Sequence, residues 1–197
     1  MADVYLDNSA TTRPYPEVIE LISKIQSETY GNPSSMHEKG LAAEKLIREA
    51  RRQIALFFNG REKEIIFTSG GTEANNLAIL GAAYRNRQRG NHLITSPVEH
   101  PSVLNCFHFL EQEGYAVSYL PVDRQGTVSP DDIRALIRKD TVLASIMHVN
   151  NEVGSIQPLK EIGRAIKEEN PAVLFHIDAV QSFARLPLKV KDWLADL

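Results

Sequence analysis

Residues 67–79 read FTSGGTEANNLAI and join a strand-like apolar stretch to a run with helical spacing through two adjacent glycines. Gly70 and Gly71 let the backbone come close to a ligand, and the amides of Thr72 and Glu73 are without partners at a helix start. Such a turn suits an anion, although an ordinary capped strand-to-helix turn has the same pattern. Neither GxxxxGK[ST] nor GxGxxG is present, which disfavours a nucleoside triphosphate or a dinucleotide.

Outward from this turn, apolar runs rich in Val, Ile and Phe alternate with segments of three- to four-residue apolar spacing. The expected strands are residues 64–70, 91–97, 115–122, 141–149 and 172–179, and the expected helices are 72–86, 100–113, 129–139 and 159–169. This alternation predicts an α/β fold with a mostly parallel sheet and helices on both of its faces. Ser129, followed by Pro130 and two aspartates, marks one helix start.

The first 60 residues follow a different pattern, with helical spacing at 16–28 and 35–58 around the turn-rich TYGNPSS at 29–35. We expect residues 1–60 to form an N-terminal helical arm or part of a smaller domain. Residues 61–197 are then the major part of a large domain.

Composition excludes several classes of function. The formal charge of −3 and pI near 6.1 provide no basic field for nucleic acid. Cys106, the single cysteine, lies in a helical run and is read as a buried structural thiol, and six histidines without ligand spacing predict no metal site. No stretch approaches the ~20 apolar residues of a membrane helix and no leader pattern is present, so we expect a cytoplasmic protein.

Polar side chains follow several expected strands at the carboxyl edge of the sheet, where open α/β folds bind ligands. They are Thr72, His100, Asn150, Asn151, Asp178 and Gln181. Each alone is more often a cap or a turn residue, but together they suit pyridoxal phosphate. The phosphate fits the helix start, His100 can stack on the ring, and Asp178 can hold the ring nitrogen protonated.

Six segments carry a resemblance to a known family: LDNSATT (6–12), GNPSSMH (31–37), FTSGGTEANNLAI (67–79), EHPSVL (99–104), SIMHVNNEVG (145–154) and HIDAVQS (176–182). In this order and spacing they resemble the cysteine desulfurases, pyridoxal-phosphate enzymes of the class-V aminotransferase group with the fold-type-I large domain. The resemblance runs from about Val4 to Leu197.

The resemblance implies roles for individual positions. Gly71 and Thr72 would bind the cofactor phosphate, His100 would stack on the ring and transfer protons, and Asp178 would contact the pyridine nitrogen. Asn151 would contact the phenolic oxygen or the substrate carboxylate, and Gln181 the phenolic oxygen. The residues expected at the mouth of the site are Asn8, Ala10, Thr11 and Asn32.

The family's Schiff-base lysine, in a Ser-x-His-Lys pattern, is expected after Leu197, and Lys39, Lys189 and Lys191 do not fit it. The persulfide cysteine, the arginine for the substrate carboxylate and the last strands of the large-domain sheet are likewise not found. The chain therefore resembles the N-terminal half of such an enzyme, inactive alone, with one sheet edge and some helix faces uncovered.

The resemblance implies L-cysteine as substrate, L-alanine and an enzyme persulfide as products, sulfur donation to iron–sulfur clusters and tRNA thiolation, sulfur-acceptor or scaffold partners, and a homodimer. Another class-V enzyme, such as a selenocysteine lyase or an aminotransferase, is the first alternative. A catalytically dead half that binds a partner through its sheet edge is the second. A dinucleotide-binding domain is the least favoured, because the glycine spacing is wrong.

Overall fold

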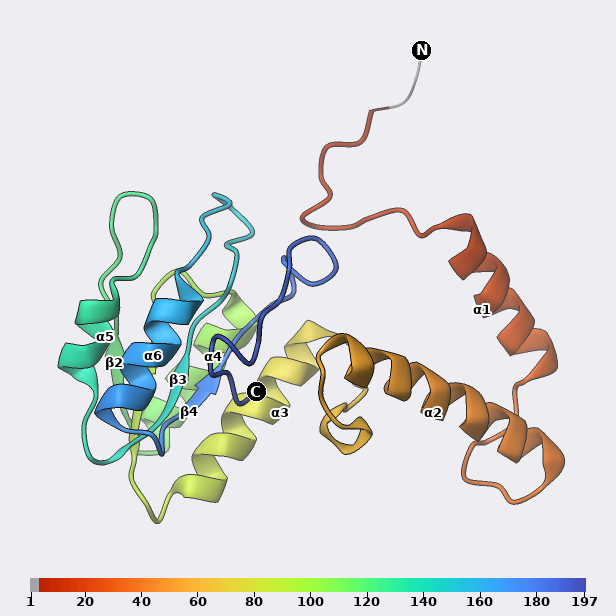
Figure 1. The fold of residues 1–197 in the computed structure, drawn as a ribbon, viewed down its shortest axis with the longest axis horizontal. Coiled ribbons are helices and arrows are strands. Elements are labelled where there is room, and N and C mark those ends of the chain that lie inside the picture. Colours follow the sequence, from red (N-terminus) through yellow and green to blue (C-terminus); the bar gives the residue numbers. More distant parts are fainter. Residues whose placement is uncertain (1–3) are drawn as a thin grey trace. The chain divides into compact units, whose positions relative to one another are not determined.

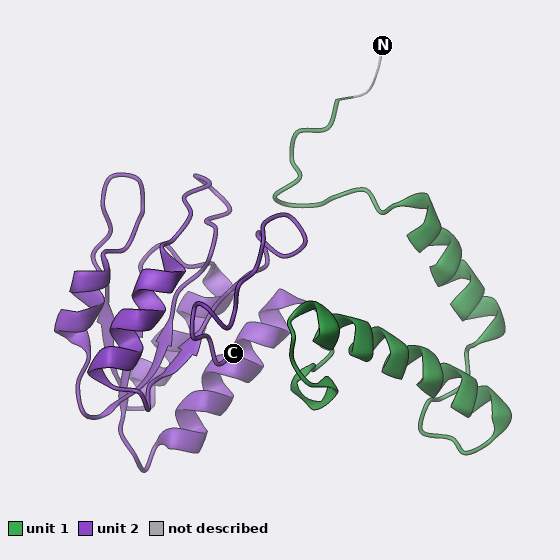
Figure 2. Ribbon diagram, viewed as in Figure 1, with its two compact units in different colours: residues 1–67 green, residues 68–197 purple. Residues whose placement is uncertain are grey.

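The structure is a computed structural model and describes residues 4–197. The chain divides into two compact units, Met1–Phe67 and Thr68–Leu197, which Figure 2 shows in green and purple. The sequence analysis places the corresponding boundary after residue 60. Each unit is described by itself.

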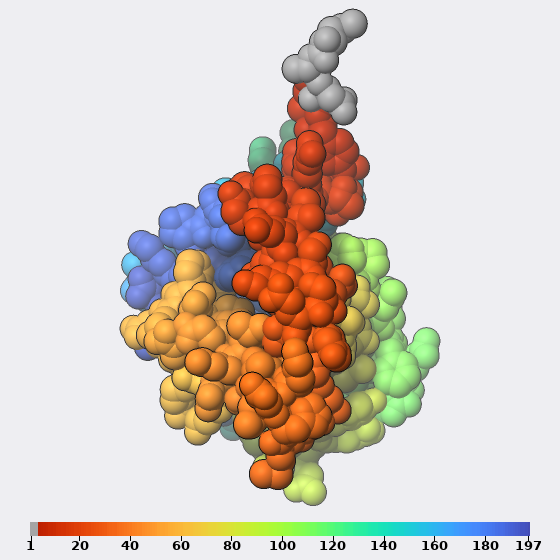
Figure 3. All heavy atoms as spheres, turned by 90° about the vertical axis from the view of Figure 1, so that its right-hand side faces the viewer, coloured from red at the N-terminus to blue at the C-terminus, as the bar shows by residue number. Residues whose placement is uncertain are grey.

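Unit 1 is helical, with α1 at Pro16–Glu28, α2 at Glu38–Phe57 and a 3-10 turn, η1, at Glu62–Glu64. Proline at the first position starts α1, and the His37 side chain caps α2 by accepting from the Gly40 amide over 3.3 Å. No residue of α1 is buried. Its exposed apolar side chains are Val18, Ile19, Leu21 and Ile22, on the unit whose surface is red to orange in Figure 3.

The strand expected at 64–70 does not form, and this prediction is wrong. Residues 65–68 have no ladder partner in the part of the chain that the structure describes. Ile66 and Phe67 are 68% and 47% exposed. Because a strand is defined by hydrogen bonds to a neighbour, apolar character alone leaves this segment extended and unpaired.

Unit 2 contains a parallel sheet of four strands in the order β2-β1-β3-β4 (Figure 1). The strands are β1 at His92–Thr95, β2 at Ala116–Tyr119, β3 at Thr141–Ser145 and β4 at Leu174–His176. The register pairs Leu93 with Val117 on one side and with Leu143 on the other. Four of the five expected strands are thus confirmed, each shorter than its apolar run.

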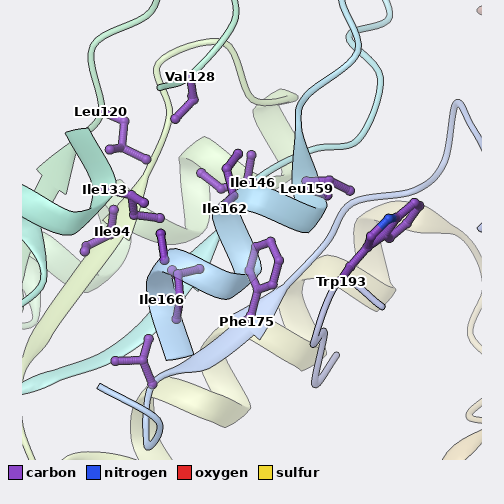
Figure 4. Close-up of a cluster of buried hydrophobic side chains, with 13 residues drawn as sticks. Ile94, Leu120, Val128, Ile133, Ile146, Leu159, Ile162, Ile166, Phe175 and Trp193 are labelled. Carbon is purple, nitrogen blue, oxygen red and sulfur yellow. The ribbon is translucent and has the colours of Figure 1, made fainter. Parts of the chain in front are cut away.

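Helices cover both faces of this sheet, as the alternating pattern predicts. They are α3 at Gly71–Asn86, α4 at Pro101–Gln112, α5 at Pro130–Leu136 and α6 at Leu159–Glu169. One core, drawn in Figure 4, joins α5 and α6 to the sheet, and the side chains of Ile162, Ile166 and Phe175 lie together in it. The second core joins α3 and α4 to the other face, with Ile79 and Phe107 fully buried.

The expected start of α5 is confirmed, since Ser129 Oγ accepts from the Asp131 amide over 3.2 Å. At the outer edge of β4, the Asp196 and Leu197 amides donate to the Phe175 carbonyl over 2.9 and 3.2 Å. Asp196 Oδ2 also accepts from Lys167 Nζ over 2.6 Å. The expected uncovered edge is therefore partly occupied by these last residues.

Candidate functional site

The start of α3 offers backbone donors. The amides of Gly71 and Thr72 have no acceptor within residues 4–197, since the first intrahelical bond runs from Ala74 to the Gly70 carbonyl over 3.1 Å. A β-carbon on Gly71 would lie 2.8 Å from Val180 Cγ2, so only glycine fits there without a shift. Thr72 is exposed. Because amides at a helix start carry partial positive charge, this turn can hold an anion.

Asp178 lies two residues beyond β4 and is 7% exposed. Its Oδ1 accepts from the Val180 amide over 3.0 Å, and its Oδ2 accepts from Asn75 Nδ2 over 2.8 Å. The Asp178 carbonyl accepts from the His148 amide over 2.9 Å, which ties the segment to the chain after β3. Each carboxylate oxygen has lone pairs for a further donor.

His100 is the N-cap of α4, and its ring is fixed by Ser102. The Ser102 amide donates to Nδ1 of His100 over 3.1 Å, and the Ser102 hydroxyl lies 2.8 Å from the same nitrogen. The residue is exposed, so a flat ring stands at the surface of unit 2 next to the buried start of α4.

Asn151 lies in the turn that follows β3, and this turn is closed by its neighbour Asn150. Asn150 Oδ1 accepts from the Glu152 and Val153 amides over 2.8 and 2.9 Å, while Nδ2 donates to the Val98 carbonyl over 2.9 Å. Asn151 is half-buried and donates to Glu152 Oε1 over 3.0 Å. Asn150 therefore holds the turn against the loop before His100, and the position of this turn determines that of Asn151.

Gln181 lies three residues after Asp178, is half-buried and accepts from Arg185 Nη1 over 3.4 Å. The four residues expected at the mouth of the site belong to unit 1 and are exposed: Asn8, Ala10, Thr11 and Asn32. Asn32 Oδ1 accepts from the Ser34 amide over 2.9 Å, and Thr11 Oγ1 hydrogen-bonds with the Tyr5 hydroxyl. Their part in the site stays a prediction.

Glu99 belongs to the same loop as His100, and sequence reasoning missed it. It is 5% exposed, and its Oε1 accepts from the Ser96 hydroxyl over 2.7 Å and from the Met147 amide over 2.9 Å. In residues 4–197, its Oε2 has no partner. Burial raises the pKa of this carboxyl group to about 8, and the charge of Asp178 acts in the same direction. The neutral acid joins the loop after β1 to the segment that follows β3.

Two other groups are structural. Burial lowers the pKa of His176 to about 4, and its Nδ1 lies 2.8 Å from Ser145 Oγ, so the ring is neutral and hydrogen-bonded between strands. Cys106 is buried in α4, as expected, and burial raises the pKa of its thiol. Within residues 4–197, no three His, Cys, Asp or Glu side chains are grouped as metal ligands, and no helix is both long and apolar enough to cross a membrane.

The residues present fit pyridoxal phosphate. Donors without acceptors stand at the start of α3, and Gly71 leaves room where a β-carbon would meet Val180. Asp178 is a buried carboxylate that is bonded to Asn75 in the same helix. These residues match the groups of the cofactor, with donors for its phosphate, a carboxylate for its protonated ring nitrogen and the His100 ring for its flat ring.

Comparison with known proteins also indicates a pyridoxal-phosphate enzyme. Cysteine desulfurase IscS of Dictyoglomus turgidum is 48% identical over 195 residues, which are 99% of this chain and 49% of that protein. A solved NifS-like protein matches with a TM-score of 0.95 at 38% identity, over 98% of this chain and 53% of its own. SspA, solved in complex with cysteine, matches with a TM-score of 0.92 at 40% identity, over 98% and 55%.

The fold is that of the pyridoxal-phosphate-dependent, NifS-like cysteine desulfurases. The sequence profile of the aminotransferase class-V family matches residues 4–197, and the chain belongs to this family. Its homologues depend on pyridoxal phosphate. The chain spans about half the length of the curated relatives it matches.

Proposed function

We propose that this chain is the N-terminal portion of a cysteine desulfurase. The reaction converts L-cysteine and an enzyme thiol into L-alanine and an enzyme persulfide, so that the sulfur atom moves from one thiol to the other. The observation that carries the proposal is the buried carboxylate of Asp178 beside the start of α3, where amides lack acceptors and Val180 lies 2.8 Å from the β-carbon position of Gly71. The names of the relatives support a cysteine desulfurase, and the products follow from the resemblance of the six segments to that family.

In this proposal the start of α3 binds the cofactor phosphate through the Gly71 and Thr72 amides and the Thr72 hydroxyl. Asp178 would accept a hydrogen bond from the pyridine nitrogen and keep it protonated. Such a charge-assisted bond contributes ~1.5–3 kcal/mol. His100 would stack on the ring. When bound, pyridoxal phosphate supplies the electron sink that breaks bonds at the substrate amino acid.

The remaining site residues orient groups around the ring. Asn151 contacts the phenolic oxygen or the substrate carboxylate, and Gln181 contacts the phenolic oxygen. Asn8, Ala10, Thr11 and Asn32 line the mouth of the site. We propose these roles from the resemblance of their segments to those of the cysteine desulfurases.

Titration of the purified 197-residue chain with pyridoxal phosphate tests the cofactor site. We expect a saturable absorbance change that borohydride does not make permanent, because no lysine present fits the Schiff-base position. Asp178→Asn should weaken this binding about tenfold, while the exposed Asp123→Asn, in the turn after β2, should not. Absence of saturable binding to the folded chain would contradict the proposal.

For the complete protein we propose L-cysteine as substrate, a homodimer, sulfur-acceptor or iron–sulfur scaffold proteins as partners, and a cytoplasmic location. Sulfide and alanine release from cysteine, measured against selenide release from selenocysteine, separates this reaction from a selenocysteine lyase. Stronger selenide release without a persulfide would refute the desulfurase.

A further inference from the structure

Two buried polar side chains connect Asp178 to His100. Asn75 in α3 and Ser102 in α4 are 5% and 7% exposed. Asn75 Nδ2 donates to Asp178 Oδ2 over 2.8 Å and to Ser102 Oγ over 2.9 Å. Ser102 Oγ lies 2.8 Å from His100 Nδ1, to which the Ser102 amide also donates over 3.1 Å. Residues far apart in the sequence are thus joined in one chain of hydrogen bonds.

The direction of each bond in this chain follows from the number of protons available. The Asn75 amide group has two N–H hydrogens, and both are used, one on Asp178 and one on Ser102. The opposite orientation of the Asn75 amide would place its oxygen against the Asp178 carboxylate, which is unfavourable. The Ser102 amide donates to His100 Nδ1, which must therefore present its lone pair, so the hydrogen between this nitrogen and Ser102 Oγ belongs to the hydroxyl.

His100 Nδ1 therefore accepts from the Ser102 amide and the Ser102 hydroxyl, which share its single lone pair, and this nitrogen carries no proton. The neutral ring must then carry its hydrogen on Nε2. Its basic nitrogen is occupied within the network, so the ring offers the outside a hydrogen-bond donor at Nε2 and no free lone pair.

We propose that Asn75 and Ser102 are positioning residues that join Asp178 and His100 into one unit and hold His100 as the Nε2–H tautomer. The consequence for catalysis rests on the proposed function: the two groups assigned to the cofactor's ring nitrogen and ring face are set together, and the resting His100 ring can donate a hydrogen bond or a proton from Nε2. Asn75, in α3, positions Asp178 directly and His100 through Ser102.

The tautomer can be measured without any cofactor. Long-range ¹H–¹⁵N spectra of the ¹⁵N-histidine-labelled chain, recorded at about pH 7.5 where most free imidazole is neutral, report which ring nitrogen is protonated. The spectrum of His100→Gln assigns the signal. We expect Nδ1 of His100 to be unprotonated in the wild type.

Asn75→Ala and Ser102→Ala should each lower the ratio of Nε2–H to Nδ1–H about three- to tenfold, because each removes one hydrogen bond that favours it. Asn86→Ala is the matched control, since Asn86 also lies in α3 but its Nδ2 donates to the Ala82 carbonyl within the helix. Ser102→Thr keeps the hydroxyl and should restore the ratio. Circular dichroism verifies that the variants are folded.

A wild-type ring protonated on Nδ1 would overturn the inference, even if neither alanine variant folds. So would ratios within twofold of wild type in both folded alanine variants. Pyridoxal phosphate binding is measured separately, and Asn75→Ala should weaken it about three- to tenfold. If the tautomer is as expected but the wild-type chain binds no cofactor, the proposed function is refuted and the hydrogen-bond network is still supported. If folded Asn75→Ala binds the cofactor as well as wild type does, the positioning role of Asn75 toward the cofactor is refuted.

Discussion

The buried acid Glu99 makes the stability of the folded chain depend on pH. Its pKa is about 8, against 4.5 for an unperturbed glutamate. In the unfolded chain the carboxyl group loses its proton near pH 4.5, whereas in the folded chain it keeps the proton until about pH 8. Between these values the unfolded state binds fewer protons, so the free energy of unfolding falls as the pH rises.

The size of this effect follows from the two pKa values. At 1.36 kcal/mol per pKa unit, ionising Glu99 in the folded chain costs about 5 kcal/mol more than in the unfolded chain. Integrated from pH 5 to pH 8, the loss of stability is about 3 to 4 kcal/mol. A domain with a total stability of ~5–15 kcal/mol loses a large part of it in this range.

Glu99→Gln should remove this dependence. The glutamine Oε1 can still accept from the Ser96 hydroxyl and the Met147 amide, and its amide nitrogen replaces Oε2 without charge. Relative to wild type, the variant should therefore gain about 3 to 4 kcal/mol between pH 5 and pH 8. Urea unfolding at both pH values, followed by the fluorescence of the single tryptophan, Trp193, which is buried, measures the difference.

Comparing wild type and variant at each pH cancels the titration of other buried groups, such as His176. Glu113→Gln, at an exposed glutamate, is the control and should show no such gain. A wild-type chain whose stability, relative to Glu99→Gln, stays constant or rises from pH 5 to pH 8 would refute the protonated, buried state of Glu99.

Three further outcomes are expected. Gly71→Ala should lower the free energy of unfolding by about 1–3 kcal/mol and weaken pyridoxal phosphate binding, because the added β-carbon would lie 2.8 Å from Val180 Cγ2. Val180→Ala should restore stability in the double variant, and a Gly71→Ala variant as stable as wild type in thermal unfolding would contradict the contact. Gly163→Ala should lower the melting temperature by several degrees, because the added methyl group would overlap the Trp193 carbonyl oxygen; an unchanged melting temperature would show that this packing is absent. Cys106 should react with iodoacetamide only on unfolding, because the thiol is buried and its pKa is raised; labelling of the native chain at the rate of a free thiol would disprove this.

Much of the fold could be predicted from periodicity. Residues 159–169 were expected as a helix and form α6, because its apolar face has helical spacing and packs in the core of Figure 4. The prediction of a strand at residues 64–70 is wrong because strand formation depends on a distant neighbour, which local apolar character does not reveal. The expected strand at 141–149 ends at Ser145 as β3. Beyond Ser145, the Ile146 amide donates to the His176 carbonyl over 3.1 Å and the His148 amide to the Asp178 carbonyl over 2.9 Å, but these bonds do not extend the strand.

The site was predicted less completely. The position after a strand predicts Asp178 and His100 as site residues, but it does not predict the residues that join them. A signal for Asn75 existed, since it lies four residues before Ile79 and seven before Ala82, on the buried face of α3. A polar side chain on an apolar helix face needs a partner. The identity of that partner, over 100 residues away, required the fold.

The strand order β2-β1-β3-β4 has a consequence for how the protein is made. During synthesis β1 emerges first, β2 adds on one side of it, β3 on the other, and β4 beside β3. No strand has to be inserted between two that are already paired. The sheet can thus grow outward from its oldest strand as the chain leaves the ribosome, with β3 and then β4 covering one edge in turn while the outer edge of β2 receives no later strand.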